Sequence, residues 1–456
     1  HSGLSSGERF DEWWRLRNGD ATIAIGARSA IFAPLSNLGL IIVDEEHDGS
    51  YSSETSPRYQ TIDVAKFRAE YNGAKLVLGS ATPSLDSYLK ATGGEYNLIE
   101  LPDRINKKPL PEVEIVDMRA EIKRGNNSPF SRALITEIED CLAQKNQAMI
   151  FLNQRGFSKS VVCTECGHVL KCEQCDVSLT YHREDDSLLC HYCGNKYKMV
   201  NACPECGSKR LKLGAFGTER IVDELNKLFP EAKILRMDRD TTQNKEGHFK
   251  ILNEFYNKHA DILVGTQMIA KGHDFASVTL VGIIDADAGL YFSDYRSAER
   301  TFQLLTQVAG RSGRADQAGK VVLQTYSPNH DILALAVNYD YKSFYKREIS
   351  LRSATGFPPF TKIVRVLISA ENEDHALSVT KSVYEELNQI YQNNKKYFRF
   401  FGCMKAPLKR LQNKYRYQVL ARIDNDKIID DFAYIANKYD DRTVSVYLEI
   451  NPSNLT

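Results

Sequence analysis

Short apolar runs separated by longer polar segments dominate the first three quarters of the chain. Such runs lie at residues 22–25, 38–43, 75–78, 148–152, 261–264 and 278–284. Runs of this length are typical of strands buried on both faces of a parallel sheet. Segments of helical periodicity at 10–17, 85–90 and 132–144 alternate with them. The pattern therefore predicts an α/β fold.

The remainder of the chain has a different pattern. Strands are expected at residues 363–369, 419–423 and 444–450, with a helix at 375–391, which together predict a small α+β domain. A length of 456 residues suits about three domains. We place them at residues 1–118, 119–335 and 336–456, with an insertion at 160–213 in the second.

Eight of the ten cysteines form four C-x-x-C pairs within one stretch of the second domain. Two thiolates three positions apart can bind one metal ion, and a second pair completes a tetrahedral shell, so the stretch predicts two Zn²⁺ sites. Gly167, Gly194 and Gly207 follow the second cysteine of three pairs, where a left-handed backbone is needed. A disulfide framework is the weaker interpretation, because this spacing in a long chain without a signal peptide favours metal.

The pairing of the four motifs is open on sequence alone, and we favour a nested arrangement. Joining consecutive pairs would leave only a short connection between two turns that must face each other. The nested sites consist of an outer set, Cys163, Cys166, Cys203 and Cys206, and an inner set, Cys172, Cys175, Cys190 and Cys193. Cys141 and Cys403 are interpreted as small core residues.

An acidic turn follows the apolar run at 38–43. In open α/β sheets, ligands bind beyond the carboxyl ends of the strands. Asp44 there could hold Mg²⁺ and Glu45 could orient an attacking water, although a solvated acidic turn is the alternative. A second strand at 75–78 runs into the small-residue turn Gly79-Ser80-Ala81-Thr82-Pro83-Ser84.

Taken together, these motifs resemble those of superfamily 2 helicases in kind and in order. The segments DEEH (44–47) and GSATPS (79–84) are similar to motifs II and III, and residues 26–34 resemble motif Ib. Residues 153–156, 265–275 and 307–314 resemble motifs IV, V and VI, and the loop at 48–63 resembles the aromatic-rich loop of the PriA family of replication-restart helicases. The resemblance implies two RecA-like lobes, the first incomplete, with an inserted two-zinc cysteine module and a C-terminal α+β domain.

The resemblance also implies roles for individual residues. The catalytic set would be Asp44, Glu45, Glu46, His47, Arg311 and Arg314. Asp44, Gly265, Thr266, Gln307, Arg311 and Arg314 would bind ATP with Mg²⁺. Tyr51, Arg58, Tyr59 and Lys271 would contact DNA.

A basic stretch in the last domain is a further candidate DNA surface. From residue 387 to 423 there is no Asp or Glu, whereas cations and aromatic residues alternate. Cations bind phosphates and aromatic faces stack on bases, although a solvated basic face is the alternative. Because acidic and basic residues balance at 59 each, any such surface must be local. The candidate residues are Lys409, Arg410, Lys414 and Arg416.

No G-x-x-x-x-G-K-[ST] loop occurs in the 456 residues, so the usual cradle for ATP phosphates is missing. We expect a chain truncated at its N-terminus and inactive as an ATPase alone, from an ATP-driven 3′→5′ DNA helicase. Its expected partners are forked and single-stranded DNA, single-stranded DNA-binding protein and other primosome proteins.

We further expect a monomer in the bacterial cytoplasm, associated with the nucleoid, since no apolar run has the ~18 residues of a membrane span. Two alternatives remain. One is a zinc-ribbon DNA-binding scaffold with a degenerate motor, and the other is a different superfamily 2 translocase.

Overall fold

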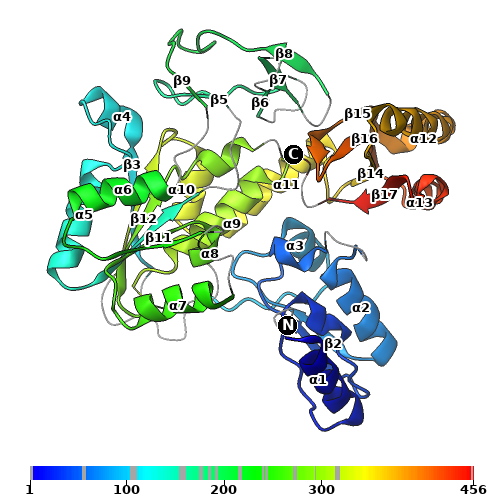
Figure 1. Cartoon of the computed structure of the whole chain (residues 1–456), viewed down its shortest axis with the longest axis horizontal. Helices are drawn as coiled ribbons and strands as arrows, with labels where there is room; N and C mark the ends of the chain where they lie inside the picture. Colours follow the sequence, from blue (N-terminus) through cyan, green and yellow to red (C-terminus); the bar gives the residue numbers. More distant parts are fainter. Residues whose placement is uncertain are drawn as a thin grey trace.

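The structure is a computed structural model that describes residues 4–53, 58–102, 110–153, 161–173, 178–182, 186–190, 194–213, 218–238, 241, 245–270, 275–292, 294–313, 319–452 and 455. Its α/β class agrees with the sequence prediction. Figure 1 shows a first segment in blue, a large sheet with its helices, a cysteine-containing insertion above that sheet and a C-terminal domain in orange and red. None of the helices in the described parts of the chain combines the length and hydropathy that a bilayer crossing requires.

The first segment holds a sheet of two parallel strands. β1 (Leu40–Val43) pairs with β2 (Lys75–Leu78) from Leu40 opposite Lys75 to Val43 opposite Leu78. The predicted strand at 22–25 is wrong: these residues form no strand, and Ile25 is 96% exposed. The helices of this segment are α1 (Ser6–Asn18), α2 (Thr61–Asn72) and α3 (Leu85–Thr92), with 3-10 turns η1 (Arg28–Phe32) and η2 (Gly49–Tyr51).

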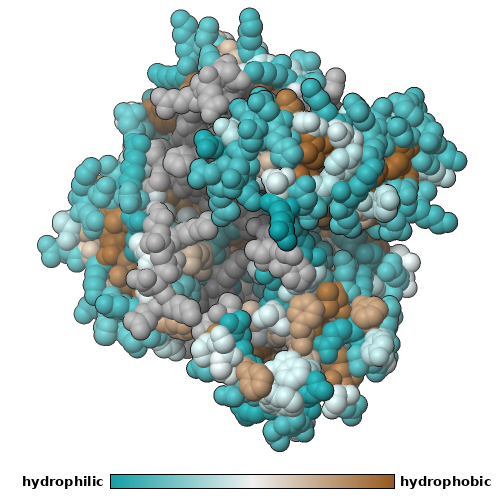
Figure 2. All heavy atoms as spheres, turned by 45° about the vertical axis from the view of Figure 1, so that its right-hand side comes forward, coloured by the Kyte–Doolittle hydropathy of each residue, from teal (hydrophilic) through white to brown (hydrophobic). Residues whose placement is uncertain are grey.

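Apolar side chains on the first segment are exposed rather than buried. α1 has no buried residue, and Leu40 and Ile42 of β1 are more than half exposed. Figure 2 shows this apolar surface on the lowest part of the molecule, while most of the surface elsewhere in that view is hydrophilic. The small core of the segment lies on the other side of the sheet, around Ile31, Val43 and Ala65.

The second lobe is built on a sheet of six parallel strands. Their order is β10 (Ile234–Met237), β11 (Ile262–Gly265), β4 (Gln147–Leu152), β12 (Val278–Ile284), β13 (Lys320–Thr325) and β3 (Glu112–Asp117). The sequence placed residues 112–117 with the first segment. Because β3 pairs with β13 along its whole length, we propose that the second lobe begins near residue 112.

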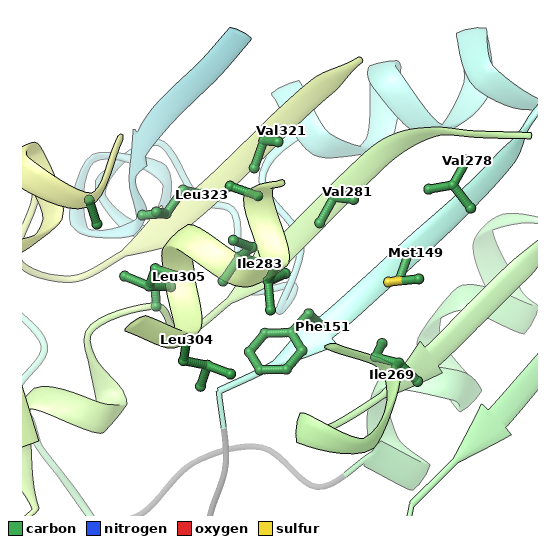
Figure 3. Close-up of a cluster of buried hydrophobic side chains, with 14 of the residues drawn as sticks. Met149, Phe151, Ile269, Val278, Val281, Ile283, Leu304, Leu305, Val321 and Leu323 are labelled. Atoms are coloured by element: carbon green, nitrogen blue, oxygen red, sulfur yellow. The ribbon is translucent and has the colours of Figure 1, made fainter. Parts of the chain in front are cut away.

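Helices cover both faces of this sheet, so its strands are buried on both sides, as continuous apolar runs predict. On one face Met149 and Phe151 pack with Ile283 and Leu305 (Figure 3). On the other, Ile150 packs with neighbours from the surrounding helices. The helices of the lobe are α4 (Met118–Lys123), α5 (Arg132–Ala143), α6 (Thr218–Leu228), α7 (Lys245–Tyr256), α8 (Gln267–Ala270), α9 (Ser297–Ala309) and α10 (Asp331–Val337), with η3 (Ala288–Tyr291).

The cysteine-rich stretch is an insertion between β4 and α6. At its root, β5 (Val161–Cys163) pairs antiparallel with β9 (Leu211–Leu213). Within it, β6 (Thr180–His182), β7 (Ser187–Leu189) and β8 (Lys196–Lys198) form a three-stranded antiparallel sheet. We call residues 161–213 the zinc module.

The C-terminal domain is an antiparallel sheet with helices on one face. α11 (Tyr341–Thr355) leads into it, and the strand order is β15 (Phe398–Leu411), β16 (Lys414–Ile423), β14 (Lys362–Ala370) and β17 (Val444–Ile450). α12 (Glu373–Asn393) and α13 (Lys427–Tyr439) cover the face that presents Val364, Val419 and Val446, and η4 (Lys395–Tyr397) precedes β15. The other face contributes Ile363 and Leu420 to a cluster with Val161, Leu170 and Leu188 of the zinc module.

One buried histidine predicts a pH dependence of stability. The Nδ1 atom of His330 accepts a hydrogen bond from the N–H of Ile332 and caps α10. Burial, aided by Arg347 and Lys171, lowers the pKa of His330 to about 4. Its contribution should be complete above the unfolded pKa of about 6.5 and be lost as the pH falls towards 4. His330→Asn keeps an acceptor without a titrating group, so we expect it to remove about 1–3 kcal/mol of the pH dependence in this window.

The measurement is the urea unfolding free energy of both proteins between pH 4 and 7, with metal supplied in excess. His375→Asn is the matched control, since His375 is exposed and also lies in the first turn of a helix. Equal slopes in wild type and His330→Asn would contradict the assignment.

Candidate functional site

The acidic turn and the small-residue turn lie together at the carboxyl ends of β1 and β2. The N–H of Gly79 donates to the carbonyl of Val43 at 2.9 Å, and the N–H of Glu46 donates to the carbonyl of Gly79 at 3.0 Å. Asp44 is exposed and Glu45 is half-buried in a left-handed backbone conformation. Carboxylates at such an edge suit Mg²⁺, which prefers oxygen ligands and retains waters.

Two side chains of the acidic turn point to the small-residue turn rather than outwards. The His47 Nδ1 atom lies 2.7 Å from the Ser80 hydroxyl. Glu46 is buried; one oxygen accepts from the N–H of Ser84 at 2.6 Å, and the other accepts from the hydroxyls of Ser84 and Ser87. Burial raises the pKa of Glu46 despite these bonds. The Glu46 carboxylate therefore holds Ser84, the N-cap residue of α3, and ties the two turns together, while the expected catalytic role of Glu46 stays a prediction.

Helix α9 of the second lobe contacts both turns. Gln307 donates from Nε2 to the Glu45 carboxylate at 3.4 Å, and Gln303 donates to the carbonyl of Thr82 at 3.3 Å. The structure thus brings Gln307 to the acidic turn. Arg311 follows the end of α9, while Gly265 and Thr266 lie where β11 ends. Arg314 and Lys271 lie outside the described residues.

A buried chain of charges fixes α3 to the second lobe. The N–H of Leu85 donates to Glu299 at 2.9 Å, and the other oxygen of Glu299 pairs with Arg352 of α11 at 2.8 Å. Arg352 also pairs with Glu348 at 3.3 Å, and Tyr341 donates to the carbonyl of Pro83. The sequence motifs did not indicate the contacts of Pro83 and Leu85, because their partners lie more than 200 residues further along the chain.

The loop after the acidic turn is bonded to that turn. Tyr51 donates its hydroxyl hydrogen to the carbonyl of Asp44 at 2.7 Å. Arg28, in the segment resembling motif Ib, donates to the carbonyls of Ser50 and Ser52 at 3.3 and 2.5 Å. Tyr59 packs edge-on against Phe32, with ring centroids 5.1 Å apart. The predicted DNA residues Tyr51 and Tyr59 are therefore held close to the candidate nucleotide site.

The outer four cysteines form a compact cluster. The Sγ atoms of Cys163, Cys166, Cys203 and Cys206 all lie within 4.8 Å of one another, and two of the separations are 3.7 and 3.6 Å. A tetrahedral shell with Zn–S bonds of about 2.3 Å places its sulfurs about 3.8 Å apart. A disulfide needs about 2.05 Å. The donor set and its spacing fit Zn²⁺.

The backbone around these cysteines has the same turn three times. The N–H groups of Gly167, Gly194 and Gly207 donate to the carbonyls of Cys163, Cys190 and Cys203 at 2.8–2.9 Å. All three glycines are left-handed, with φ of 71 to 80°, as the sequence predicted. Burial opposes ionisation of Cys163, but the N–H groups of Cys166 and Glu165 outweigh it and lower the pKa of the Cys163 thiol. Burial and the neighbouring thiols of the cluster raise the pKa of Cys166 to about 12, so binding of a metal would have to release that proton.

Half of the inner set lies within the described residues. Cys172 and Cys190 are buried beneath the C-terminal sheet, and the hairpin β6–β7 lies between them in the chain. The Cys172 thiol lies 3.4 Å from the Tyr197 hydroxyl. Cys175 and Cys193 fall outside the described residues, so the second Zn²⁺ site stays a prediction.

The first cysteine turn is docked on the second lobe. Arg119, which also pairs with Asp117, donates to the carbonyl of Cys166 at 2.9 Å. A Cβ atom at Gly167 would lie only 2.5 Å from the carbonyl oxygen of Tyr326, so only glycine allows this approach. The outer cluster is therefore fixed against the strands of the lobe.

The predicted basic residues of the C-terminal domain lie along the hairpin of β15 and β16. Lys409 and Arg410 stand over the Tyr415 ring at 5.8 and 5.1 Å, and Lys409 pairs with Glu373. Lys414 is exposed and Arg416 is half-buried. A register shift between Lys405 and Arg410 bends the strand that carries them. The sequence did not predict β15, because its charged residues obscure the alternation.

Comparison with known proteins gives three family-model matches along the chain. Residues 172–198 match the PriA DNA helicase Cys-rich region domain, 208–316 the helicase conserved C-terminal domain and 353–453 the Primosomal protein N C-terminal domain. Replication restart protein PriA of Bacillus subtilis is 43% identical over 99% of this chain and 56% of its own length. The proteins of that name from Borreliella burgdorferi and Haemophilus influenzae are 34% and 35% identical, over 96% and 100% of this chain and 65% and 62% of their own lengths. The chain therefore spans less than two thirds of these relatives.

Proposed function

Because this chain belongs to the PriA family of replication restart helicases, we propose that it forms part of an ATP-driven 3′→5′ DNA helicase. Its substrate would be a stalled or branched replication fork, where it would start primosome assembly. In this proposal the protein works in the bacterial cytoplasm, with single-stranded DNA-binding protein and other primosome proteins as partners. Its cofactors are ATP, Mg²⁺ and two Zn²⁺ ions.

The contact between Glu45 and Gln307 is the observation that carries the motor proposal. It joins the acidic turn of one lobe to α9 of the other at 3.4 Å. In an enzyme that works by closing two lobes, a hydrogen bond between the two halves of the site would form and break with closure. The other oxygen of the half-exposed Glu45 carboxylate lies 3.6 Å from the His47 Nδ1 atom, on the side where a water would be oriented.

The proposal gives each residue a task. Asp44 would hold Mg²⁺, Glu45 would orient the attacking water, and Gln307 would fix the Glu45 carboxylate across the lobe boundary. When bound, ATP would supply the phosphoryl group and Mg²⁺ would neutralise its charge. Arg311 and Arg314 would stabilise the charge that develops on that group, and Gly265 and Thr266 would contribute to nucleotide binding.

Without a P-loop of its own, we expect the 456-residue chain to bind ATP weakly and not to hydrolyse it. The measurement is phosphate release with and without single-stranded DNA, with Glu45→Gln as the background control. DNA-stimulated hydrolysis that disappears in Glu45→Gln would show that this chain does not need the loop.

The DNA surface can be tested on the chain as it stands. Neutralising Lys414 and Arg416 together should weaken binding of a forked oligonucleotide about 10-fold near 100 mM salt and reduce the salt slope by about 2. Fluorescence anisotropy between 50 and 300 mM salt measures both. Lys381→Ala, on the exposed side of α12, is the matched control.

Unchanged DNA affinity and an unchanged salt slope in the double variant would mean that the basic residues of the β15–β16 hairpin are solvated and do not contact DNA. The scaffold alternative predicts normal DNA binding with no dependence on nucleotide. It is separated from the motor by Glu45→Gln in a full-length version of the protein, in which a pure scaffold would keep all its activity. The family-model matches to the cysteine-rich and C-terminal domains argue against another superfamily 2 translocase.

A further inference from the structure

Arg58 of the aromatic-rich loop contacts the C-terminal domain. Its guanidinium carbon stands 3.5 Å from the centroid of the Tyr447 ring, and its Nε atom lies 3.6 Å from the Glu449 carboxylate. Both partners belong to β17, almost 400 residues further along the chain. β17 is an edge strand of the C-terminal sheet, and in Figure 1 it lies on the side of that sheet that is nearest the first segment.

Glu449 is shared between two arginines. Its other oxygen accepts from Arg365 of β14 at 2.6 and 2.7 Å, which is closer than the approach of Arg58. The side chains of Arg58, Glu449 and Arg365 are 30%, 17% and 10% exposed. If Arg58 moves away, the Glu449 carboxylate still accepts two hydrogen bonds from Arg365 and is not left as an unpaired buried charge. Breaking the contact between Arg58 and Glu449 therefore costs little free energy, whereas breaking an isolated buried ion pair would cost much more.

The base of the loop is tied to the acidic turn by a short series of hydrogen bonds. The carbonyl of Tyr59 accepts from the N–H of Ser53 at 2.8 Å, and Ser52 pairs with Gln60. Thr61 donates to the carbonyl of Tyr51 at 2.8 Å, and Tyr51 donates to the carbonyl of Asp44 at 2.7 Å. A displacement of Arg58 would thus be transmitted through these hydrogen bonds to the carbonyl of Asp44.

We propose that β17 holds Arg58 when no DNA is bound, and that a phosphate of the DNA strand takes Arg58 from Tyr447 and Glu449. This inference rests on the proposed function, since it deepens the role of the loop as a DNA contact. A guanidinium binds phosphate through two parallel hydrogen bonds, which the single longer contact to Glu449 does not provide. Tyr447 and Glu449 are positioning residues: they set where the loop, and with it the acidic turn, rests before DNA arrives.

The test is a double-mutant cycle on DNA affinity. Tyr447→Leu removes the ring under Arg58 and should raise affinity for single-stranded DNA about 3-fold, whereas Tyr447→Phe keeps the ring and should match wild type. Arg58→Ala should lower affinity and abolish the effect of Tyr447→Leu. Amide hydrogen exchange at Ser53 should quicken in Tyr447→Leu without DNA, because the loop base loses its anchor. Tyr434→Leu, on the exposed side of α13, is the matched control.

Opposite results would overturn the proposal. If Tyr447→Leu lowers DNA affinity, the strand presents Arg58 to DNA rather than withholding it. If the gain persists in the Arg58→Ala background, the ring acts on something other than Arg58. The Lys414 and Arg416 double variant distinguishes failure of the proposed function from failure of the Arg58 inference. Normal DNA binding by this variant would contradict the proposed DNA surface. Weak binding by this variant, with no coupling between Arg58 and Tyr447 in the cycle, would contradict only the Arg58 inference.

Discussion

Replacing Cys206 with serine is expected to remove about one zinc ion per chain and to lower the stability of the zinc module by ~3 kcal/mol or more. Cys206 is exposed, so the substitution creates no cavity and its whole effect comes from the lost ligand. A structural Zn²⁺ ion contributes ~10–16 kcal/mol to small zinc domains, and a three-thiolate site retains only part of that. The six-stranded sheet should be unaffected, because the cluster closes the root of an insertion and lies outside the core of the lobe.

The two tryptophans of the chain decide how this is measured. Trp13 and Trp14 both lie in α1, so their fluorescence does not report on the zinc module. Zinc content is therefore measured with a chromophoric chelator after denaturation, and module stability by hydrogen exchange at residues 161–163 and 211–213. Cys403→Ser is the control, since Cys403 is also exposed, contrary to the core position expected from the sequence, but lies in the C-terminal domain. Equal zinc content in both variants, together with equal hydrogen exchange at residues 161–163 and 211–213, would contradict the assignment of the outer site.

Arg352→Met is expected to cost about 3–5 kcal/mol of unfolding free energy. The substitution leaves Glu299 and Glu348 as neighbouring buried carboxylates without their shared cation, which is the costly way to break a buried ion pair. The loss should be largest for the contact of α3 with the second lobe, because Glu299 also accepts the N–H of Leu85. Urea unfolding followed by circular dichroism gives the total, and hydrogen exchange of the Leu85 amide gives the local effect.

Two further variants make this result interpretable. Adding Glu299→Gln and Glu348→Gln to Arg352→Met removes the stranded charges and should recover at least about half of the loss. Arg347→Met on the same helix removes a cation that is 39% exposed and makes only longer contacts, so it should cost less than about 1 kcal/mol. A similar loss of unfolding free energy in Arg347→Met and Arg352→Met would show that the buried chain of charges contributes no more to stability than an exposed ion pair.

The sequence predicted most of the second lobe because its strands are apolar on both faces. Residues 278–284 were placed without error, and β4 and β11 within one residue, since a continuous apolar run between polar turns has few other interpretations. The same reasoning failed at residues 22–25, where a β-branched run found no strand to pair with. It also missed β15, whose lysines and arginines lie on a hairpin partly open to solvent. In the first case no strand lies beside the segment, and in the second the charged residues obscure the alternation although the pairing strand β16 follows directly in the chain.

In the candidate site, too, the sequence predicted local turns but not the contacts between residues far apart in the chain. Motif spacing correctly indicated which turns lie at strand ends, and the glycine conformations followed from the cysteine spacing. It could not indicate that Glu46 faces Ser84 and Ser87, because these partners belong to the start of α3, about 40 residues further along the chain. Contacts such as Leu85 with Glu299 join residues 214 positions apart, and no local pattern encodes them.

The pairing of β5 with β9 has a consequence for how this protein could have arisen. Because Val161 lies opposite Leu213, the two ends of the zinc module leave the lobe side by side. A segment with adjacent ends can be gained or lost in a single genetic event without altering the strand order of its host. The lobe and the module could therefore have separate evolutionary histories. Replacing residues 164–210 with a two-residue hairpin turn should yield a lobe that still folds, a minimal ancestor that can be made in the laboratory.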